Sequence, residues 1–305
     1  MHPLRSLWLT VALSLIVAFL GSVSRPAAAP IGQPTPPLPP PSVGRLTVLD
    51  LNMLHGWPHF THLAQRVAVL QAFLAARGPD LVLLQEVPWR PETGPLARAL
   101  ADDTYAWAFA RANGNRYLLR FEEGEAILSH FPILEWEVRE LYPRPMPWEH
   151  RVVLHARIQL PQGPLHLFVT HLTHRDPEVN ARQGALLYRV VAETAQDQPA
   201  LIAGDFNAEP TSSTIRQLQG WIDLYARQHP QEPGYTCCVA GPEDLTGAFT
   251  KRIDYLFYRP GSRGPRLMVE RITLAWETPF PTPNGPLWIS DHLGLWAEMD
   301  VAPAP

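Results

Sequence analysis

The most conspicuous shortage in this chain of 305 residues is lysine: Lys251 is the only one, and nearly all of the 25 basic residues are arginine. Charged residues make up only 18% of the sequence, and the formal net charge is −4. This composition does not predict the strongly basic surface that is typical of tight nucleic-acid binding. It leaves a weak or transient nucleic-acid contact open.

Cysteine is also scarce, since the chain has two, Cys237 and Cys238, and they are neighbours. Neighbouring cysteines can close only a small ring, so they cannot cross-link distant parts of the chain, and a disulfide scaffold is excluded. We expect two partly buried thiols beside a turn, with a redox or metal-binding role as the alternative. Stability must then come from an apolar core, for which a hydrophobic content of 46% is sufficient.

The N-terminal segment lacks an apolar run long enough to cross a bilayer as a helix. Residues 7–21 are almost entirely apolar, but these 15 residues fall short of the roughly 20 that a spanning helix needs. Arg5 precedes the run, and the small residues 27–29 follow it as a candidate cleavage site. Residues 1–29 are therefore predicted to be a signal peptide or an uncleaved N-terminal membrane anchor. The protein is expected to be exported, as a secreted, periplasmic or outer-face membrane-anchored protein.

A proline-dense segment separates this leader from the rest of the chain. Residues 30–42 contain the run PIGQPTPPLPPP, which is typical of an extended polyproline linker. The folded domain is predicted to occupy residues 43–302. Without the two arginines of the leader it has 23 basic and 29 acidic residues, a net charge of −6. Nothing in this domain requires more than a monomer.

Within the domain, short apolar strands alternate with amphipathic helices. Strands are predicted at residues 45–52, 80–87, 125–129, 133–141, 151–160, 165–171, 200–205, 253–258, 266–274 and 292–299, and helices at 62–77, 177–196 and 211–218. Several strands follow one another as hairpins, which does not fit a purely parallel sheet. The pattern predicts an α+β fold in which two mixed β-sheets pack together and helices flank them.

Polar side chains recur where the predicted strands end. Asn52, Glu86, His171 and Asp205 each close an apolar strand, and the pair 291–292 precedes the last strand. A single acid at a strand end is usually a turn former, but five such ends on one rim would form a site. Carboxylates and amides bind a hard divalent cation through oxygen, and a base and imidazoles can activate water and stabilise developing charge.

Seven segments, in this order, resemble the endonuclease/exonuclease/phosphatase superfamily. They are LDLNMLHG around Asn52, LLQEV around Glu86, GEAILSHFPI from Gly124, THL around His171, GDFN around Asp205, RIDYLF around Asp254 and SDH at residues 290–292. The resemblance covers nearly the whole domain. It implies the DNase I-like fold, a four-layer sandwich of two packed mixed β-sheets flanked by helices, and hydrolysis of a phosphate ester by metal-assisted attack of water.

The resemblance also implies a metal site. Glu86 corresponds to the principal metal ligand of the superfamily, and Asn52 and Asp291 lie in or near the same shell. The expected cation is Mg²⁺ or Mn²⁺, which suits a set of carboxylates and amides without soft ligands. His171 and His174 have the H-x-x-H spacing of some zinc sites, but no third zinc ligand accompanies them in the sequence.

The remaining roles concern the phosphate. By resemblance, Asp205 orients or deprotonates the attacking water, and Asn207 helps to hold the phosphate or the metal. His171 and His292 donate hydrogen bonds to the non-bridging phosphate oxygens. Asp254 holds the His292 imidazole and favours its protonated form.

The sequence leaves the substrate open. An acidic domain with one lysine disfavours tight DNA binding, whereas the proline-rich aromatic loops at 142–148 and 278–288 could contact a membrane. Nucleic acid and a phospholipid or sphingomyelin-type lipid therefore both stay in consideration as substrates, with other, smaller phosphoesters behind them. The alternative from another class is a non-catalytic, membrane-tethered binding module of the same fold.

Overall fold

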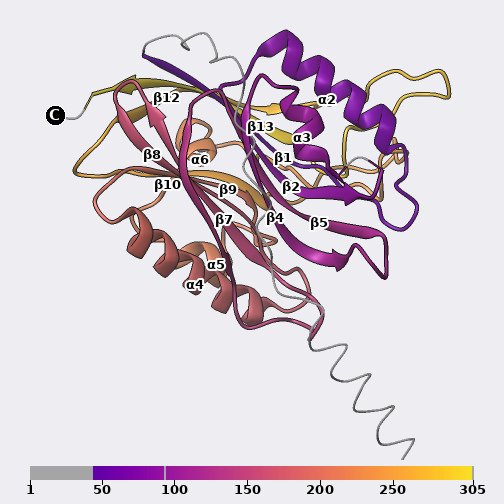
Figure 1. Ribbon diagram of the computed structural model, residues 1–305, viewed down its shortest axis with the longest axis horizontal. Coiled ribbons are helices and arrows are strands. Elements are labelled where there is room, and N and C mark those ends of the chain that lie inside the picture. The colour runs from indigo at the N-terminus through magenta and orange to yellow at the C-terminus, as the bar shows by residue number, and fades with distance from the viewer. Residues whose placement is uncertain (1–43, 93, 304–305) are drawn as a thin grey trace, which may run out of the picture.

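The computed structural model describes residues 44–92 and 94–303, which form two β-sheets packed face to face (Figure 1). Sheet A has seven strands in the order β12-β13-β1-β2-β5-β4, with β3 beside β2. Sheet B has six strands in the order β10-β11-β9-β8-β7-β6. The predicted fold class, two packed mixed sheets flanked by helices in a DNase I-like sandwich, is confirmed.

The strands of sheet A are β1 (Arg45–Asn52), β2 (Leu81–Arg90), β3 (Gly94–Pro95), β4 (Ala106–Asn115), β5 (Phe121–Ser129), β12 (Arg266–Ala275) and β13 (Gly294–Ala302). Those of sheet B are β6 (Ile133–Glu140), β7 (Val152–Leu160), β8 (Gly163–His171), β9 (Ala200–Asp205), β10 (Ile222–Asp223) and β11 (Asp254–Arg259). The helices are α2 (Leu63–Arg77), α3 (Leu96–Ala101), α4 (Pro177–Ala195), α5 (Ser213–Arg216) and α6 (Leu224–Gln228).

Both sheets are mixed, and alternation along their strands builds three apolar layers. The β1–β2 and β8–β9 pairs are parallel, and the other pairs are antiparallel. On β1, Leu46 and Val48 join the core between the sheets, while Leu49 and Leu51 pack with α2 on the outer face of sheet A. The outer face of sheet B packs with α4 in the same way. Because successive side chains of a strand point to opposite faces, fully apolar strands bury both faces.

The helix that covers sheet B begins where the sequence predicts. The Asp176 side chain accepts hydrogen bonds from the backbone N–H groups of Glu178 and Val179, and Pro177 occupies the first turn. An aspartate cap followed by proline satisfies backbone donors that would otherwise lack partners. This start fixes α4 beside the loop that follows β8, which carries part of the site.

The structure extends the predicted elements in one place that matters for function. Strand β5 begins at Phe121 rather than at residue 125, and it pairs with β4 as a hairpin whose connection is Arg116–Arg120. The predicted leader, residues 1–29, and the predicted linker, residues 30–42, lie outside the described residues. Among the residues that the structure describes, no helix is long and apolar enough to cross a membrane.

Two stacked histidines on sheet B predict a pH dependence of stability. His155 Nε2 lies 2.8 Å from His166 Nδ1, and burial together with the neighbouring His166 lowers the pKa of His155 to about 3. The unfolded chain therefore binds more protons than the folded protein between pH 6.5 and pH 3, so stability falls as pH falls through this window. Urea unfolding should give a free energy of unfolding lower by roughly 1–2 kcal/mol at pH 5 than at pH 7. A His155→Gln variant should lose part of this difference; an identical pH dependence in both proteins would contradict the assignment.

Candidate active site

Three adjacent strands of sheet B end in a row of polar side chains. His171 at the end of β8 is in register with Asp205 at the end of β9, and Asp205 is paired with Asp254 at the start of β11. Neighbouring residues across strands lie about 5 Å apart. The strand ends predicted from the sequence are thus brought side by side on one rim.

The glycine of the GDFN segment is required by this close pairing. A Cβ added to Gly204, whose φ is 140°, would lie 1.9 Å from the carbonyl oxygen of Thr170 on the neighbouring strand. Two residues later, Asn207 has a φ of 47°, and its backbone N–H donates to Asp205 Oδ1 at 2.8 Å. Asparagine tolerates this left-handed conformation better than most residues. The segment turns sharply so that the Asp205 and Asn207 side chains both face the rim.

Sheet A contributes Asn52 from the end of β1 and Glu86 from β2. The pairing of β2 with β5 shifts register between Leu84 and Val87, and Glu86 within this bulge has a φ of 54°. Bulges re-aim side chains, and a non-glycine residue in the left-handed region marks a position where the surroundings impose the conformation. The bulge turns the Glu86 carboxylate toward the rim of sheet B.

The Asn52 amide joins the two sheets at this point. Its Nδ2 donates to Asp205 Oδ2 at 3.1 Å and to Glu86 Oε1 at 3.3 Å. Burial alone would raise the pKa of Glu86, but His55, whose backbone N–H donates to the carboxylate, and His292 outweigh it and lower the pKa. Glu86 is therefore ionised at neutral pH, as a cation ligand must be.

His292 is held as a charged donor. Its Nδ1 lies 2.8 Å from Asp254 Oδ2, and the Thr236 hydroxyl donates to the same carboxylate. Burial would lower the pKa of His292, but the carboxylates of Asp254, Asp205 and Asp291 outweigh that effect and raise it well above its usual range. The ring nitrogen that remains, Nε2, faces Asp205 Oδ2 at 3.8 Å. The imidazolium thus directs one N–H toward the centre of the site.

His171 is the opposite case, a neutral imidazole. Burial, followed by Arg151 and the other histidines of the site, lowers its pKa well below the usual range. The Asn207 amide donates to the Leu172 carbonyl at 3.0 Å, so its NH₂ group also faces His171 Nε2 at 3.0 Å. The proton of the ring therefore lies on Nδ1, which has no hydrogen-bond partner among the described residues and lies 4.0 Å from Glu86 Oε1.

The rim opens into a cavity of about 930 Å³. Asp291, in the connection between β12 and β13, lines this cavity together with Glu86. Burial raises the pKa of the Asp205 carboxyl, with Asp254 adding to the effect and His292 opposing it. Asp205 is thus placed to accept a proton from a molecule in the cavity. The two predicted phosphate-binding histidines, His171 and His292, both lie next to it. Asp254 lies behind His292.

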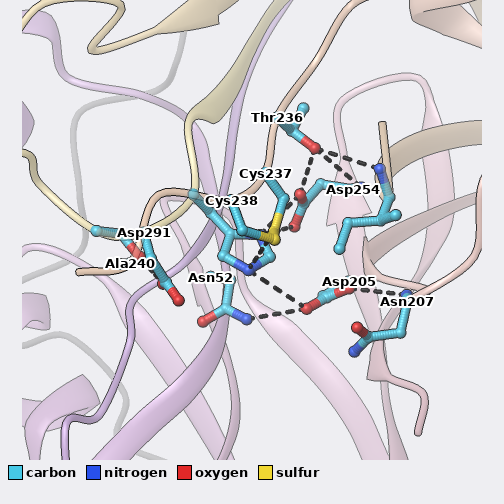
Figure 2. The surroundings of a disulfide bond; sticks show 12 residues. Asn52, Asp205, Asn207, Thr236, Cys237, Cys238, Ala240, Asp254 and Asp291 are labelled. Carbon is cyan, nitrogen blue, oxygen red and sulfur yellow. Dashed lines mark hydrogen bonds and ion pairs between the residues drawn. A yellow bond between two sulfur atoms is a disulfide. The ribbon is translucent and has the colours of Figure 1, made fainter. Parts of the chain in front are cut away.

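The two cysteines differ from the prediction, because they are bonded to each other rather than present as thiols. Figure 2 shows the disulfide beside Asp205 and Asp254, and Cys237 Sγ lies 3.5 Å from His292 Nε2. Backbone pairing explains this placement, since the strand-like segment at Cys237 bridges to both Lys251 and His292. The sulfurs line the cavity, and no thiolate is left for a metal.

Opening this disulfide should lower activity. Cys237 of the bonded pair contacts His292, and the preceding residue, Thr236, donates its hydroxyl to the Asp254 carboxylate. Reduction of the bond should therefore make the positions of both His292 and Asp254 less fixed. We expect a phosphine reductant to reduce kcat by about 3-fold to 100-fold, the range in which small displacements of catalytic groups act. A variant with Cys237→Ser and Cys238→Ser should be insensitive to the reductant. Full activity of the reduced wild-type protein would contradict this role.

Two buried residues that position the site were not predicted. The Arg66 guanidinium on α2 donates to the carbonyls of Met53, Leu54 and Ile289, and so joins the loops that carry Asn52 and Asp291. On α4, the Asn180 amide donates to the carbonyls of Thr173 and Phe206, and so joins the His171 and Asp205 loops. A lone arginine or asparagine inside a helix pattern reads as a solvated position, and the sequence gives no signal for either role.

Several residues of the connecting loops also line the cavity. They include His55 and Trp57 on the loop after β1, Arg151 before β7, and His174 after β8. The further lining residues Leu118, Leu119, Phe121 and Trp148 are apolar and come from the β4–β5 hairpin and the loop before β7. The cavity therefore has a polar floor and an apolar wall.

Comparison with known proteins agrees with this geometry. The sequence profile of the endonuclease/exonuclease/phosphatase family matches residues 51–292. The chain belongs to this family. A relative within it, the uncharacterized protein YbhP of Escherichia coli K12, is 29% identical over 270 residues, which cover 83% of this chain and 96% of the relative.

Solved structures of the family have the same fold. Danio rerio TDP2, crystallised with a single-strand DNA product, superposes with a TM-score of 0.66 at 20% identity, over 84% of this chain and 98% of that chain. The human Nocturnin catalytic domain with bound sulfate gives a TM-score of 0.65 at 21% identity, over 85% and 94%. At such identities the likeness establishes the fold alone.

Proposed function

We propose that the protein is a divalent-metal-dependent phosphodiesterase. The observation that carries the proposal is the convergence of Glu86, Asp205, His171 and His292 from both sheets on one cavity. Membership of a family whose members are mostly phosphoester hydrolases supports it. The proposal includes export of a monomer to the cell exterior or periplasm, which rests on the predicted leader.

The residues present fit a hard divalent cation. Glu86, Asp291 and Asn52 offer carboxylate and amide oxygens, and burial, with the Glu86 carboxylate adding to it and His292 opposing it, raises the pKa of Asp291. Oxygen donors of this kind suit Mg²⁺ or Mn²⁺. When bound, the cation would neutralise charge on the phosphoryl oxygens.

The chain's own residues account for the proton and charge movements. The Asp205 carboxylate, fixed by the Asn207 N–H and the Asn52 amide, takes a proton from the attacking water. His292 and His171 both line the cavity, and their ring N–H groups would stabilise the charge that develops on the non-bridging oxygens. Asp254 holds the tautomer and charge of His292 throughout.

The test uses a soluble phosphodiester. Hydrolysis of bis-p-nitrophenyl phosphate should require Mg²⁺ or Mn²⁺, should be abolished by EDTA, and should return when the cation is restored. Rates unaffected by EDTA would refute the metal dependence. Absence of hydrolysis with either cation would favour the non-catalytic binding module.

A further inference from the structure

We propose that the connection between β4 and β5 docks on a lipid bilayer and that the substrate is a phosphodiester lipid held in that bilayer. This inference rests on the proposed function and names its substrate class. We call residues 116–120 the hairpin tip. Three consecutive apolar residues occupy it, with Tyr117 88% exposed, Leu118 59% and Leu119 49%.

The hairpin tip is built to stay exposed. The Asn115 side-chain oxygen accepts hydrogen bonds from the backbone N–H groups of Tyr117 and Leu118, and the Leu119 N–H donates to the Asn115 carbonyl. This local turn satisfies the backbone while it projects the apolar side chains outward. Three exposed apolar residues in succession are a liability for a soluble surface, so they indicate a contact with an apolar partner.

The exposed tip is continuous with the catalytic cavity. Leu118 and Leu119 line the cavity that holds Asp205, and so does Trp148, which is 67% exposed. Trp57 lines the same wall and stacks on Phe121, with ring centroids 5.7 Å apart. A molecule whose phosphate lies at Asp205 would therefore meet an apolar wall that leads to the tip. Amphipathic aromatic rings and leucines are typical of surfaces that enter the interface of a bilayer.

The charges around the tip favour a lipid over a nucleic acid. Arg116 is paired with Glu122 at 2.7 Å and Arg120 with Glu92 at 3.4 Å. Arg175, which also lines the cavity, is paired with Glu149. Arginines with such partners offer little to a run of phosphates, and nucleic-acid binding depends on neutralising several of them. Bases could stack on the exposed rings of Tyr117 and Trp148, but the leucines of the tip add only apolar surface, which suits a bilayer.

The reaction on such a lipid needs only water as co-substrate. A water oxygen bonds to phosphorus as its proton passes to Asp205, and the bond between phosphorus and one ester oxygen breaks. That oxygen takes a proton from solvent and leaves as an alcohol, Asp205 returns its proton to solvent, and the other product is a phosphomonoester. The apolar wall would hold the lipid part while the polar floor holds the phosphate.

The experiment compares two substrates in the same protein. The rate on vesicles of sphingomyelin with phosphatidylcholine, measured as released phosphomonoester, is divided by the rate on bis-p-nitrophenyl phosphate. A Leu118→Ser/Leu119→Ser variant should lower this ratio at least about 10-fold, because each leucine loses the free energy of apolar burial. Met268→Ser, at a 54% exposed position on β12, is the matched control and should keep the ratio.

A binding measurement makes the test independent of turnover. Sedimentation of the Asp205→Asn protein with the same vesicles should occur, and addition of the two serine substitutions should reduce the bound fraction several-fold. Two results would overturn the inference but leave the proposed function standing. In the first, the enzyme hydrolyses bis-p-nitrophenyl phosphate but not the vesicle lipids; in the second, the Leu118→Ser/Leu119→Ser variant has the same ratio of the two rates as the wild-type protein. Faster, tip-dependent hydrolysis of single-stranded DNA would also overturn it. No activity on bis-p-nitrophenyl phosphate would instead remove the proposed function.

Discussion

Asp205→Asn should lower kcat for bis-p-nitrophenyl phosphate by about 10²–10⁴-fold, the usual contribution of a positioned general base. The substitution keeps the shape of the side chain and an oxygen that can accept the Asn207 N–H, but it removes the proton acceptor. Burial, with Asp254 adding to it, raises the pKa of Asp205, which makes this carboxylate a stronger proton acceptor than an exposed aspartate. Steady-state kinetics at saturating Mg²⁺ measure the loss.

The matched control for this variant is Asp103→Asn, an exposed residue just before β4, whose opposite end, at Asn113 and Asn115, lines the cavity. It should have the kcat of the wild-type protein. A kcat for Asp205→Asn within a factor of about three of wild type would contradict the assignment of Asp205 as base.

Glu86→Gln should affect the metal dependence above all. The amide keeps the volume and one oxygen but loses the charge that attracts the cation. Residues that merely support metal ligands cost about 10–100-fold when they are replaced, so loss of the ligand's charge should raise the Mg²⁺ concentration for half-maximal activity at least about 100-fold.

A titration of activity with Mg²⁺ measures this shift, and isothermal calorimetry with Mg²⁺ alone measures it without turnover. Glu193→Gln, on the exposed face of α4, should leave the titration unchanged. An unchanged Mg²⁺ requirement in Glu86→Gln, with activity reduced equally at every concentration, would place Glu86 outside the metal site.

The rim of the site was predictable because the ends of paired neighbouring strands lie side by side. Apolar strands that end in His171 and Asp205 must bring these residues side by side once the strands pair, and register then adds Asp254. Two packed mixed sheets followed from the hairpins and from the mixture of strands and helices along the chain, and the four layers came from the resemblance. The positions of the elements therefore came from periodicity, and the roles came from the resemblance.

What the sequence could not provide depends on long-range contacts. The bond between Cys237 and Cys238 differs from the expected free thiols, and the place of Cys237 against His292 depends on its backbone pairing with both Lys251 and His292. The exposure of the apolar residues 117–119 is visible only in the fold. Arg66 looks like a solvated helix residue, although it is almost completely buried among carbonyls.

The Asn52 amide lies on sheet A and donates hydrogen bonds to Glu86 on the same sheet and to Asp205 on sheet B. Ligand binding at this point is therefore coupled to the packing of the two sheets, and so to the stability of the domain. A ligand gripped there by Glu86 and Asp205 would find no equivalent site in an unfolded chain, where those groups are far apart. Thermodynamic linkage then makes each tenfold excess of ligand over its dissociation constant worth about 1.4 kcal/mol of folding free energy. The melting temperature therefore reports how much of the site is occupied. Candidate lipids and cations can be ranked by the increase in melting temperature that each one causes at the same concentration.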